Sequence, residues 1–125
     1  MGGADSMAKT YEDLVREAKD VTEQTDASSI HATLNSGEEV TVVDVREPAE
    51  WEEGHIPGAT NIPRGLLEYL AADKLPDKNA RIVVHCALGG RGSLAAQSLQ
   101  EMGYENVVNM DGGMKDWREN GYEVE

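Results

Sequence analysis

Cysteine and phenylalanine are the two scarcest residue types in this chain: its 125 residues contain one cysteine, Cys86, and no phenylalanine. A single cysteine excludes an internal disulfide, a zinc site built from cysteines and a Cys-x-x-Cys redox pair. Without phenylalanine, the core is expected to consist mainly of Val, Leu, Ile and Ala. The sequence also lacks a signal peptide and any apolar run long enough to span a bilayer, so we expect a cytoplasmic protein.

Basic residues are also in short supply, with 11 Lys and Arg against 24 Asp and Glu and a net charge of −13. A negative field of this size disfavours nucleic acids and anionic membrane surfaces as partners. A site for an anionic substrate therefore has to be made positive locally. The length suits one domain, which we place at residues 10–125, with residues 1–9 as a disordered or expression-derived N-terminal segment.

Strand and helix patterns alternate along the chain. Short β-branched runs at residues 40–45, 81–85 and 107–110 predict buried strands, and a weaker run at residues 21–24 predicts an edge strand. Helical patterns lie between them, at residues 26–34, 65–75, 94–102 and 114–120. This order predicts an α/β fold with a mostly parallel central sheet of about five strands and helices on both faces. Ligands of such sheets bind beyond the carboxyl ends of the strands.

The predicted strand at residues 81–85 leads directly into Cys86, and a glycine-rich turn and a helix follow. Backbone N–H groups at such a turn, together with the helix dipole, favour an anion. A helix N-terminus and a nearby arginine favour the thiolate form of a cysteine, so we interpret this loop as the cradle of a nucleophile. A lone cysteine is more often a small buried hydrophobic residue, but three glycines and an arginine in the next six positions favour the catalytic interpretation.

Each residue of this loop has an expected role. The backbone amides are expected to surround the sulfur, and they belong to Ala87, Leu88, Gly89, Gly90 and Arg91. Arg91 is expected to favour the thiolate and to bind the anionic end of a donor; the alternative is an arginine at the helix start that faces solvent. Ser93 is expected to be a helix cap.

Four further residues are candidates for supporting roles. Asp44 and Arg46 follow a strand that should neighbour the Cys86 strand, and they either orient the loop backbone or form a structural ion pair. His55 is expected to be part of the loop architecture, and Arg64 is a candidate for the rim of the site. His85 is expected in the core, while the acidic run at residues 47–53 is expected to be a solvated helix face.

Three segments, at residues 44–59, 86–91 and 110–117, resemble the signature segments of the rhodanese homology family of sulfurtransferases, in the same order and spacing. The resemblance implies a single-domain, rhodanese-like fold and thiosulfate sulfurtransferase activity. Cys86 would take the outer sulfur of a donor such as thiosulfate, release sulfite and hold the sulfur as a persulfide. A thiol or cyanide would then accept the sulfur, or a protein acceptor would do so. The chemistry needs no metal and no cofactor.

Two alternatives remain open at this stage. Cysteine-dependent phosphatases and arsenate reductases also use a Cys–loop–Arg cradle, with five residues between the two. Four residues separate Cys86 from Arg91 here, and the shorter loop suits one sulfur atom better than a tetrahedral phosphate. The other alternative is a non-catalytic rhodanese-like module for protein interaction, and the presence of the nucleophile weighs against it.

Overall fold

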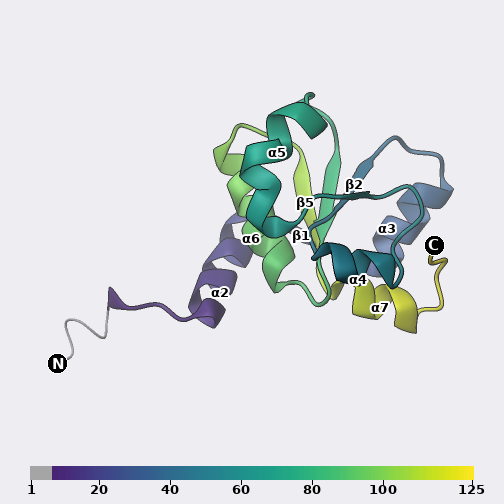
Figure 1. Cartoon of the computed structure of the whole chain (residues 1–125), viewed down its shortest axis with the longest axis horizontal. Helices are drawn as coiled ribbons and strands as arrows, with labels where there is room; N and C mark the ends of the chain where they lie inside the picture. The colour runs from purple at the N-terminus through teal and green to yellow at the C-terminus, as the bar shows by residue number, and fades with distance from the viewer. Residues whose placement is uncertain (1–6) are drawn as a thin grey trace.

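The computed structural model describes residues 7–125, and Figure 1 shows a central sheet with helices packed around it. The five strands are all parallel and lie in the order β1-β5-β4-β2-β3. The predicted α/β architecture is thus confirmed. The strands are β1 (Glu23–Thr25), β2 (Thr41–Asp44), β3 (Thr60–Asn61), β4 (Ile82–His85) and β5 (Val107–Met110).

Helices connect the strands, as parallel pairing requires. They are α2 (Tyr11–Val21), α3 (Ala27–Asn35), α4 (Pro48–Glu52), the 3₁₀ turn η1 (Arg64–Leu66), α5 (Leu67–Lys74), α6 (Gly90–Glu101) and α7 (Gly113–Glu119). None of these helices is both long and apolar enough to cross a bilayer. The prediction for residues 1–9 falls mainly on residues 1–6, which lie outside the described residues.

The two faces of the sheet bury two separate clusters of apolar side chains. Along β4, Ile82 and Val84 point to one face and Val83 to the other, as the two-residue period of a strand dictates. The first face packs against α5 and α6, and the second against α3 and α7. Valine, isoleucine, leucine and alanine make up most of both clusters, as expected for a chain without phenylalanine.

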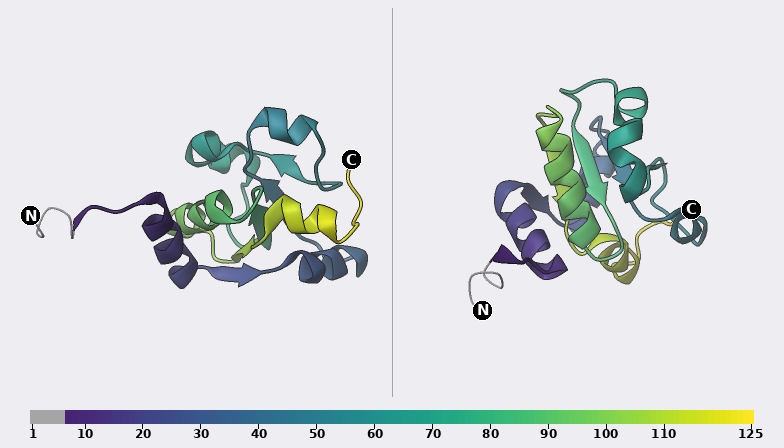
Figure 2. Two further views of the ribbon diagram at one scale, coloured as in Figure 1. Left: turned by 90° about the horizontal axis from the view of Figure 1, so that it is seen from below. Right: turned by 60° about the vertical axis from the view of Figure 1, so that its left-hand side comes forward.

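Helix α2 lies outside these layers and packs along α6, as two views show (Figures 1 and 2). A capping box starts this helix, in which the Thr10 hydroxyl accepts from the Asp13 N–H and the Asp13 carboxylate accepts from the Thr10 N–H. Reciprocal caps of this kind satisfy backbone donors that a helix start leaves open. The helix is therefore fixed at the end that lies near the loop after β4.

Helix α6 begins four residues earlier than predicted, at Gly90 rather than at residue 94. Glycine is a poor helix former, which favours a loop at this point of the sequence. In the structure, packing against the sheet and α2 holds Gly90 and Gly92 in the first turn of α6. The prediction that Ser93 caps this helix is therefore wrong. Gly89 occupies the cap position, and Ser93 is buried inside the helix, where its hydroxyl accepts from Asn109 Nδ2 at 3.1 Å.

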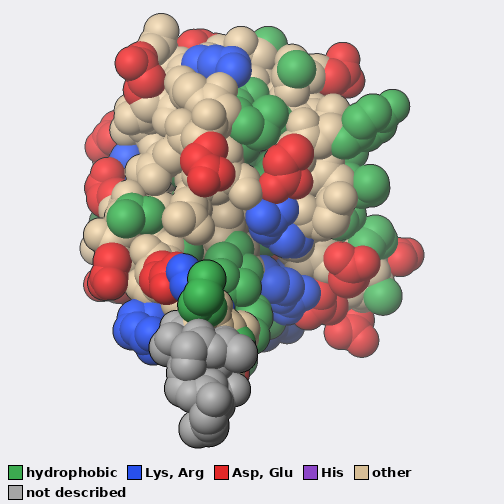
Figure 3. Space-filling view, turned by 90° about the vertical axis from the view of Figure 1, so that its left-hand side faces the viewer, with side chains coloured by type: hydrophobic (Ala, Val, Ile, Leu, Met, Phe, Trp, Pro, Cys, Tyr) green, Lys and Arg blue, Asp and Glu red, His purple; other side chains and the backbone are tan. Residues whose placement is uncertain are grey.

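Figure 3 shows the face of the molecule that lies on the left in Figure 1. Acidic side chains are spread over this face, and most of its basic side chains lie in the lower half, beside hydrophobic ones. With a net charge of −13 for the whole chain, positive potential can arise only where a few basic side chains gather.

Candidate active site

Cys86 follows the last residue of β4 and is only 1% exposed, with its side chain on the α5–α6 face of the sheet. The Gly89 N–H donates to Cys86 Sγ across 3.0 Å. The amides of five loop residues were expected around the sulfur. Among the hydrogen bonds of the described residues, only the Gly89 amide contacts it. The sulfur lies beneath the loop rather than on its surface, and Cys86 is a member of the apolar cluster on this face of the sheet, the burial that a lone cysteine more often has.

The backbone conformation of Gly89 directs its amide at the sulfur. Its φ is 142°, a region that favours glycine, and a Cβ at this position would collide with Asp111 Oδ1. The Gly89 carbonyl accepts from the Ser93 N–H at 3.0 Å and from Asn109 Nδ2 at 3.4 Å. Gly89 is therefore held through its carbonyl, in the peptide group that follows it, while its N–H, in the peptide group that precedes it, points to Cys86.

Arg91 is paired with an acidic residue that the sequence analysis assigned to a solvated face. Its Nη1 and Nη2 donate to the two carboxylate oxygens of Glu50 across 2.7 and 3.1 Å. These bonds lower the pKa of Glu50 to about 2, so Glu50 is ionised at neutral pH. The pair joins α4 to the first turn of α6, and it compensates the arginine charge that was expected to act on the thiol.

Glu50 was missed because its run of acidic residues looked like a solvent-facing surface. The available signal was its position inside the segment 44–59, between the strand end and the Gly-His-Ile-Pro-Gly loop. Only the packing of α4 against α6 makes it a partner of Arg91.

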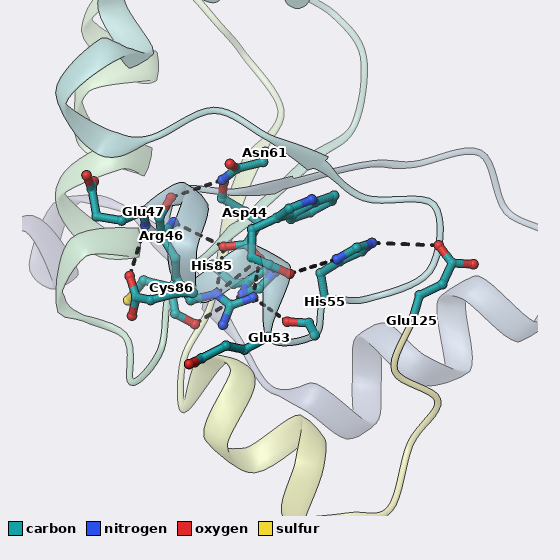
Figure 4. A network of polar contacts seen from close by, with 12 residues as sticks. Asp44, Arg46, Glu47, Glu53, His55, Asn61, His85, Cys86 and Glu125 are labelled. Carbon is teal, nitrogen blue, oxygen red and sulfur yellow. Dashed lines mark hydrogen bonds and ion pairs between the residues drawn. The ribbon is translucent and has the colours of Figure 1, made fainter.

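Asp44 and Arg46 form a buried ion pair, shown in Figure 4. Arg46 Nη2 donates to Asp44 Oδ2 at 2.7 Å, and Arg46 Nε donates to both carboxylate oxygens. The same Nη2 donates to the Gly54 carbonyl at 2.8 Å, which ties the start of the β2–β3 connection to its middle. The pair thus holds the segment that carries Glu50 and acts on the loop through that segment.

His85 is fully buried in β4, in agreement with the expectation. Its Nδ1 lies 3.1 Å from the Cys86 carbonyl oxygen, and a nitrogen facing a carbonyl has to donate. Burial lowers the pKa of His85 below its usual range, although the nearby Asp44 carboxylate opposes this effect. His85 is therefore neutral at pH 7 and holds the backbone carbonyl of Cys86.

His55 and Arg64 lie in other contacts. The His55 ring stacks on Trp51 with centroids 3.5 Å apart, its Nδ1 lies 3.0 Å from the Trp51 carbonyl, and its Nε2 faces Glu125 at 3.7 Å (Figure 4). Arg64 donates to Glu68 at 2.7 Å and to the Ser98 hydroxyl at 3.0 Å. Both residues brace connections between elements, and neither has a hydrogen bond to the Cys86 loop among the described contacts.

Helix α7 holds the loop from the other side. The Met114 N–H donates to the Cys86 carbonyl at 2.9 Å, and the Lys115 N–H donates to the Ala87 carbonyl at 3.0 Å. A Cβ at Gly113 would collide with the Cys86 carbonyl oxygen, so the helix can approach this closely only with glycine there. The third signature segment thus binds the backbone of Cys86 and Ala87 through two hydrogen bonds.

A pocket of about 340 Å³ opens beside the loop between α4 and α7. Three basic side chains contribute to its walls, two of which the sequence analysis missed although they belong to or adjoin the third segment. Lys115 is paired with Glu119 at 2.9 Å, whereas Arg118 makes long contacts of 3.4 and 3.5 Å to backbone carbonyls. The lining residues are Arg46, Glu50, Glu53, Ala87, Leu88, Met114, Lys115 and Arg118.

The pocket can accept an anion because Arg118 has donors to spare and Lys115 lies beside it. Metal chemistry has no evident ligand set, since residues 7–125 contain no group of three His, Cys, Asp or Glu side chains placed to hold an ion. The arrangement therefore offers a cysteine, a backbone donor aimed at it and the Arg118 guanidinium, which makes no ion pair in the described structure, in a pocket whose walls also carry Glu50 and Glu53.

The fold and this site define a parallel α/β domain with a cysteine loop between a strand and a helix. A family model described as "Rhodanese-like domain" matches residues 26–120, and the chain belongs to this family. It is 40% identical over 74 residues to "Thiosulfate sulfurtransferase PspE" of Escherichia coli, covering 59% of this chain and 70% of that protein. It is 37% identical over 84 residues to "Putative sulfur carrier protein YrkF" of Bacillus subtilis, covering 67% of this chain and 44% of that longer protein.

A solved structure from Rhodopseudomonas palustris is similar over nearly the full length. The match has a TM-score of 0.86 and 31% identity and covers 95% of this chain and 96% of that one. Its description is a protein of unknown function and a "Possible Tyrosine Phosphatase". The relatives thus support a sulfurtransferase of the rhodanese type at the level of the family, and they make the phosphatase alternative worth testing directly.

Proposed function

We propose that the protein transfers a sulfane sulfur from an anionic donor such as thiosulfate to a thiophilic acceptor through a persulfide on Cys86. The Cys86 thiolate attacks the outer sulfur of thiosulfate, the S–S bond of the donor breaks, and sulfite leaves with the electron pair. The acceptor then attacks the terminal sulfur of the persulfide and regenerates the thiolate. The observation that carries the proposal is the hydrogen bond from the Gly89 N–H to Cys86 Sγ at the end of β4.

The loop and α6 supply the electrostatic support for this chemistry. Helix α6 is 12 residues long and starts at Gly90, so the partial positive charge of its N-terminus lies close to the sulfur. A backbone donor and a helix dipole that point at the sulfur stabilise an anionic thiolate or persulfide. Because Cys86 is 1% exposed, the loop has to shift to accommodate a second sulfur atom.

The sulfonate end of the donor would lie in the pocket beside the loop. Arg118 brings a guanidinium without an ion pair in the described structure, Lys115 adds an ammonium group that is shared with Glu119, and Leu88 provides an apolar edge that is 64% exposed. Arg91 is already engaged by Glu50 in a bidentate pair, so we assign it to holding the loop and assign Arg118 to the donor.

The acceptor has to come from outside the chain. Cys86 is the only cysteine, so no second thiol of the same chain can resolve the persulfide. We propose a small thiol or a protein acceptor in the cell, with cyanide as the acceptor in an assay. The sulfur carrier relative named above is consistent with delivery to a protein.

The phosphatase alternative is less well supported by the geometry. A Cys-dependent phosphatase needs an arginine free to bind the equatorial oxygens of phosphate, and Arg91 is compensated by Glu50. The cradle is also one residue shorter than that of those enzymes.

Intact-mass measurement tests the proposal. Treatment of the reduced protein with thiosulfate should add the mass of one sulfur atom, and cyanide should remove it. Cys86→Ser should retain the fold, because the change is nearly isosteric, and should show no added mass. A phosphate ester serves as the competing substrate. Turnover of the ester with no sulfur added to wild type would decide for the phosphatase.

A further inference from the structure

Helix α2 precedes the residues that the family model matches, 26–120, and yet it contacts the loop that carries Cys86. Its first residue, Tyr11, lies against Gly90, the first residue of α6. A Cβ at Gly90 would collide with Tyr11 Oη and would lie 2.9 Å from Tyr11 Cζ and 3.4 Å from Val15 Cγ2. Gly90 does not have a positive φ, so its backbone conformation would allow a side chain. The obstacle to a side chain at this position is the clash with Tyr11.

The same helix reaches Gly89 through a second contact. Lys19 Nζ lies 3.0 Å from Asp111 Oδ1, and this carboxylate oxygen occupies the space where a Gly89 Cβ would be. Helix α2 thus contacts one glycine of the loop directly and the other through Asp111. The two contacts lie on either side of the peptide group between Gly89 and Gly90 and limit where this turn can lie.

The amide that contacts the sulfur lies directly before this peptide group, at the N–H of Gly89. The Gly89 N–H donates to Cys86 Sγ, and a displacement of Gly90 would move this donor. The Tyr11 side chain is 52% exposed, so little core packing explains where it lies. The pKa of Arg91 is raised mainly by Glu50, with smaller contributions from Cys86 and Tyr11, which agrees with a phenol close to the guanidinium.

We propose that α2 is a working part of the sulfur-transfer site and that Tyr11 is its positioning residue, holding the Gly89–Gly90 turn so that the Gly89 amide remains on Cys86. The inference deepens the proposed function and rests on Cys86 as the reacting group. Tyr11 acts through the loop backbone, so its effect should appear in the reactivity of the thiol and not only in stability.

The test is a double-mutant cycle read by the rate of Cys86 alkylation with iodoacetamide as a function of pH. Gly90→Ala should force the turn away from Tyr11 and shift the midpoint of the rate profile to higher pH by about one unit, because the thiolate loses its donor. Adding Tyr11→Ala makes room for the new methyl group. The double variant should therefore match Tyr11→Ala alone, a coupling that independent sites do not show.

Three controls separate this effect from general damage. Gly89→Ala shifts the profile through its φ and its clash with Asp111, so Tyr11→Ala should not restore it. Gly65→Ala places a methyl group where no heavy atom lies within 4 Å and should leave the profile unchanged. Val21→Ala trims an exposed side chain at the other end of α2 and should do the same.

Each outcome decides a definite point. An unchanged profile in Gly90→Ala would mean that Tyr11 swings aside. A shift in the double variant equal to the sum of the shifts of the two single variants would mean that Tyr11 and Gly90 act independently; either result overturns the inference. Should Gly90→Ala not fold, Tyr11→Ala alone must raise the midpoint while Tyr11→Phe raises it less, and equal profiles for all three proteins overturn it as well. Normal alkylation of wild type without sulfur uptake from thiosulfate refutes the proposed function but leaves the coupling measurable.

Discussion

Two adjacent residues at the end of β4, His85 and Cys86, have the most unusual surroundings for their side-chain chemistry. Cys86 is buried under its loop, and His85, which is fully buried on the same strand, donates from Nδ1 to the Cys86 carbonyl. Its Nε2 has no hydrogen-bond partner among the described residues. A buried polar atom without a partner has a free-energy cost, and protonating this ring would add a charge that burial disfavours.

His85 makes the stability of the protein sensitive to mild acid. Its folded-state pKa lies below the ordinary 6.5, so the unfolded chain binds a proton first as the pH falls. The stabilisation is complete above pH 6.5, and it decreases as the pH falls from 6.5 toward the folded-state pKa, with a slope of at most one proton. Urea unfolding of wild type at pH 7 and pH 5 should show this loss, and His85→Asn should reduce it. Equal pH dependence in the two proteins would contradict the assignment.

At the scale of elements, the short helix α4 connects the buried Asp44–Arg46 ion pair to the start of α6, next to the Cys86 loop. Arg46 fixes the connection through the Gly54 carbonyl, and α4 presents Glu50 to Arg91 on α6. Glu50 and Arg91 side chains are each 34% exposed, so solvent screens the pair and its contribution to stability is modest. Structurally, the pair joins α4 to the first turn of α6.

Replacing Glu50 tests this link. The pKa of Glu50 is about 2 in the folded protein against an ordinary 4.5, so the pair stabilises fully above pH 4.5 and is lost as the pH falls toward 2. Glu50→Gln should cost about 1 kcal/mol or less at pH 7 and should remove the Glu50 part of the acid dependence. Denaturant unfolding at pH 7 and pH 3 measures both effects. Glu52→Gln, on the same helix without an ion pair in the described structure, is the matched control.

The elements show where sequence reasoning succeeds and where it stops. Periodicity and β-branched runs placed β2, β4 and β5 within one or two residues because strands buried on both faces have a simple pattern. The predicted start of α6, at residue 94, was wrong because Gly90 and Gly92 are helical only through tertiary packing. Glu50, Lys115 and Arg118 could not be assigned to the site, since each reaches it only when α4 and α7 lie beside the loop.

On the scale of the whole molecule, net charge sets the conditions for substrate binding. A charge of −13 repels anionic donors over distances up to the Debye length, and added salt screens this repulsion. Local cations in the pocket have to overcome it at close range. Arg118 is the side chain best placed for this task, because its guanidinium contacts only carbonyl oxygens at 3.4 and 3.5 Å.

Arg118→Ala should therefore raise the KM for thiosulfate by about tenfold at low salt, the effect of losing one charge-assisted contact. The maximal rate with cyanide as acceptor should change little, since the residue does not contact Cys86. Steady-state kinetics at two ionic strengths measure both quantities. Arg16→Ala, which removes an exposed arginine paired with Asp13 on α2, keeps the same net charge and should leave KM unaltered; an equal rise in both variants would point to the overall field instead of the pocket.

The burial of Cys86 has a consequence for the lifetime of the sulfur that it would hold. A persulfide in bulk water is quickly reduced by abundant small thiols or damaged by peroxide, whereas one stored under a closed loop meets neither until the loop opens. Transfer of the sulfur would then depend on the acceptor that opens the loop. The protein would give its sulfur to that acceptor rather than lose it to other thiols in solution.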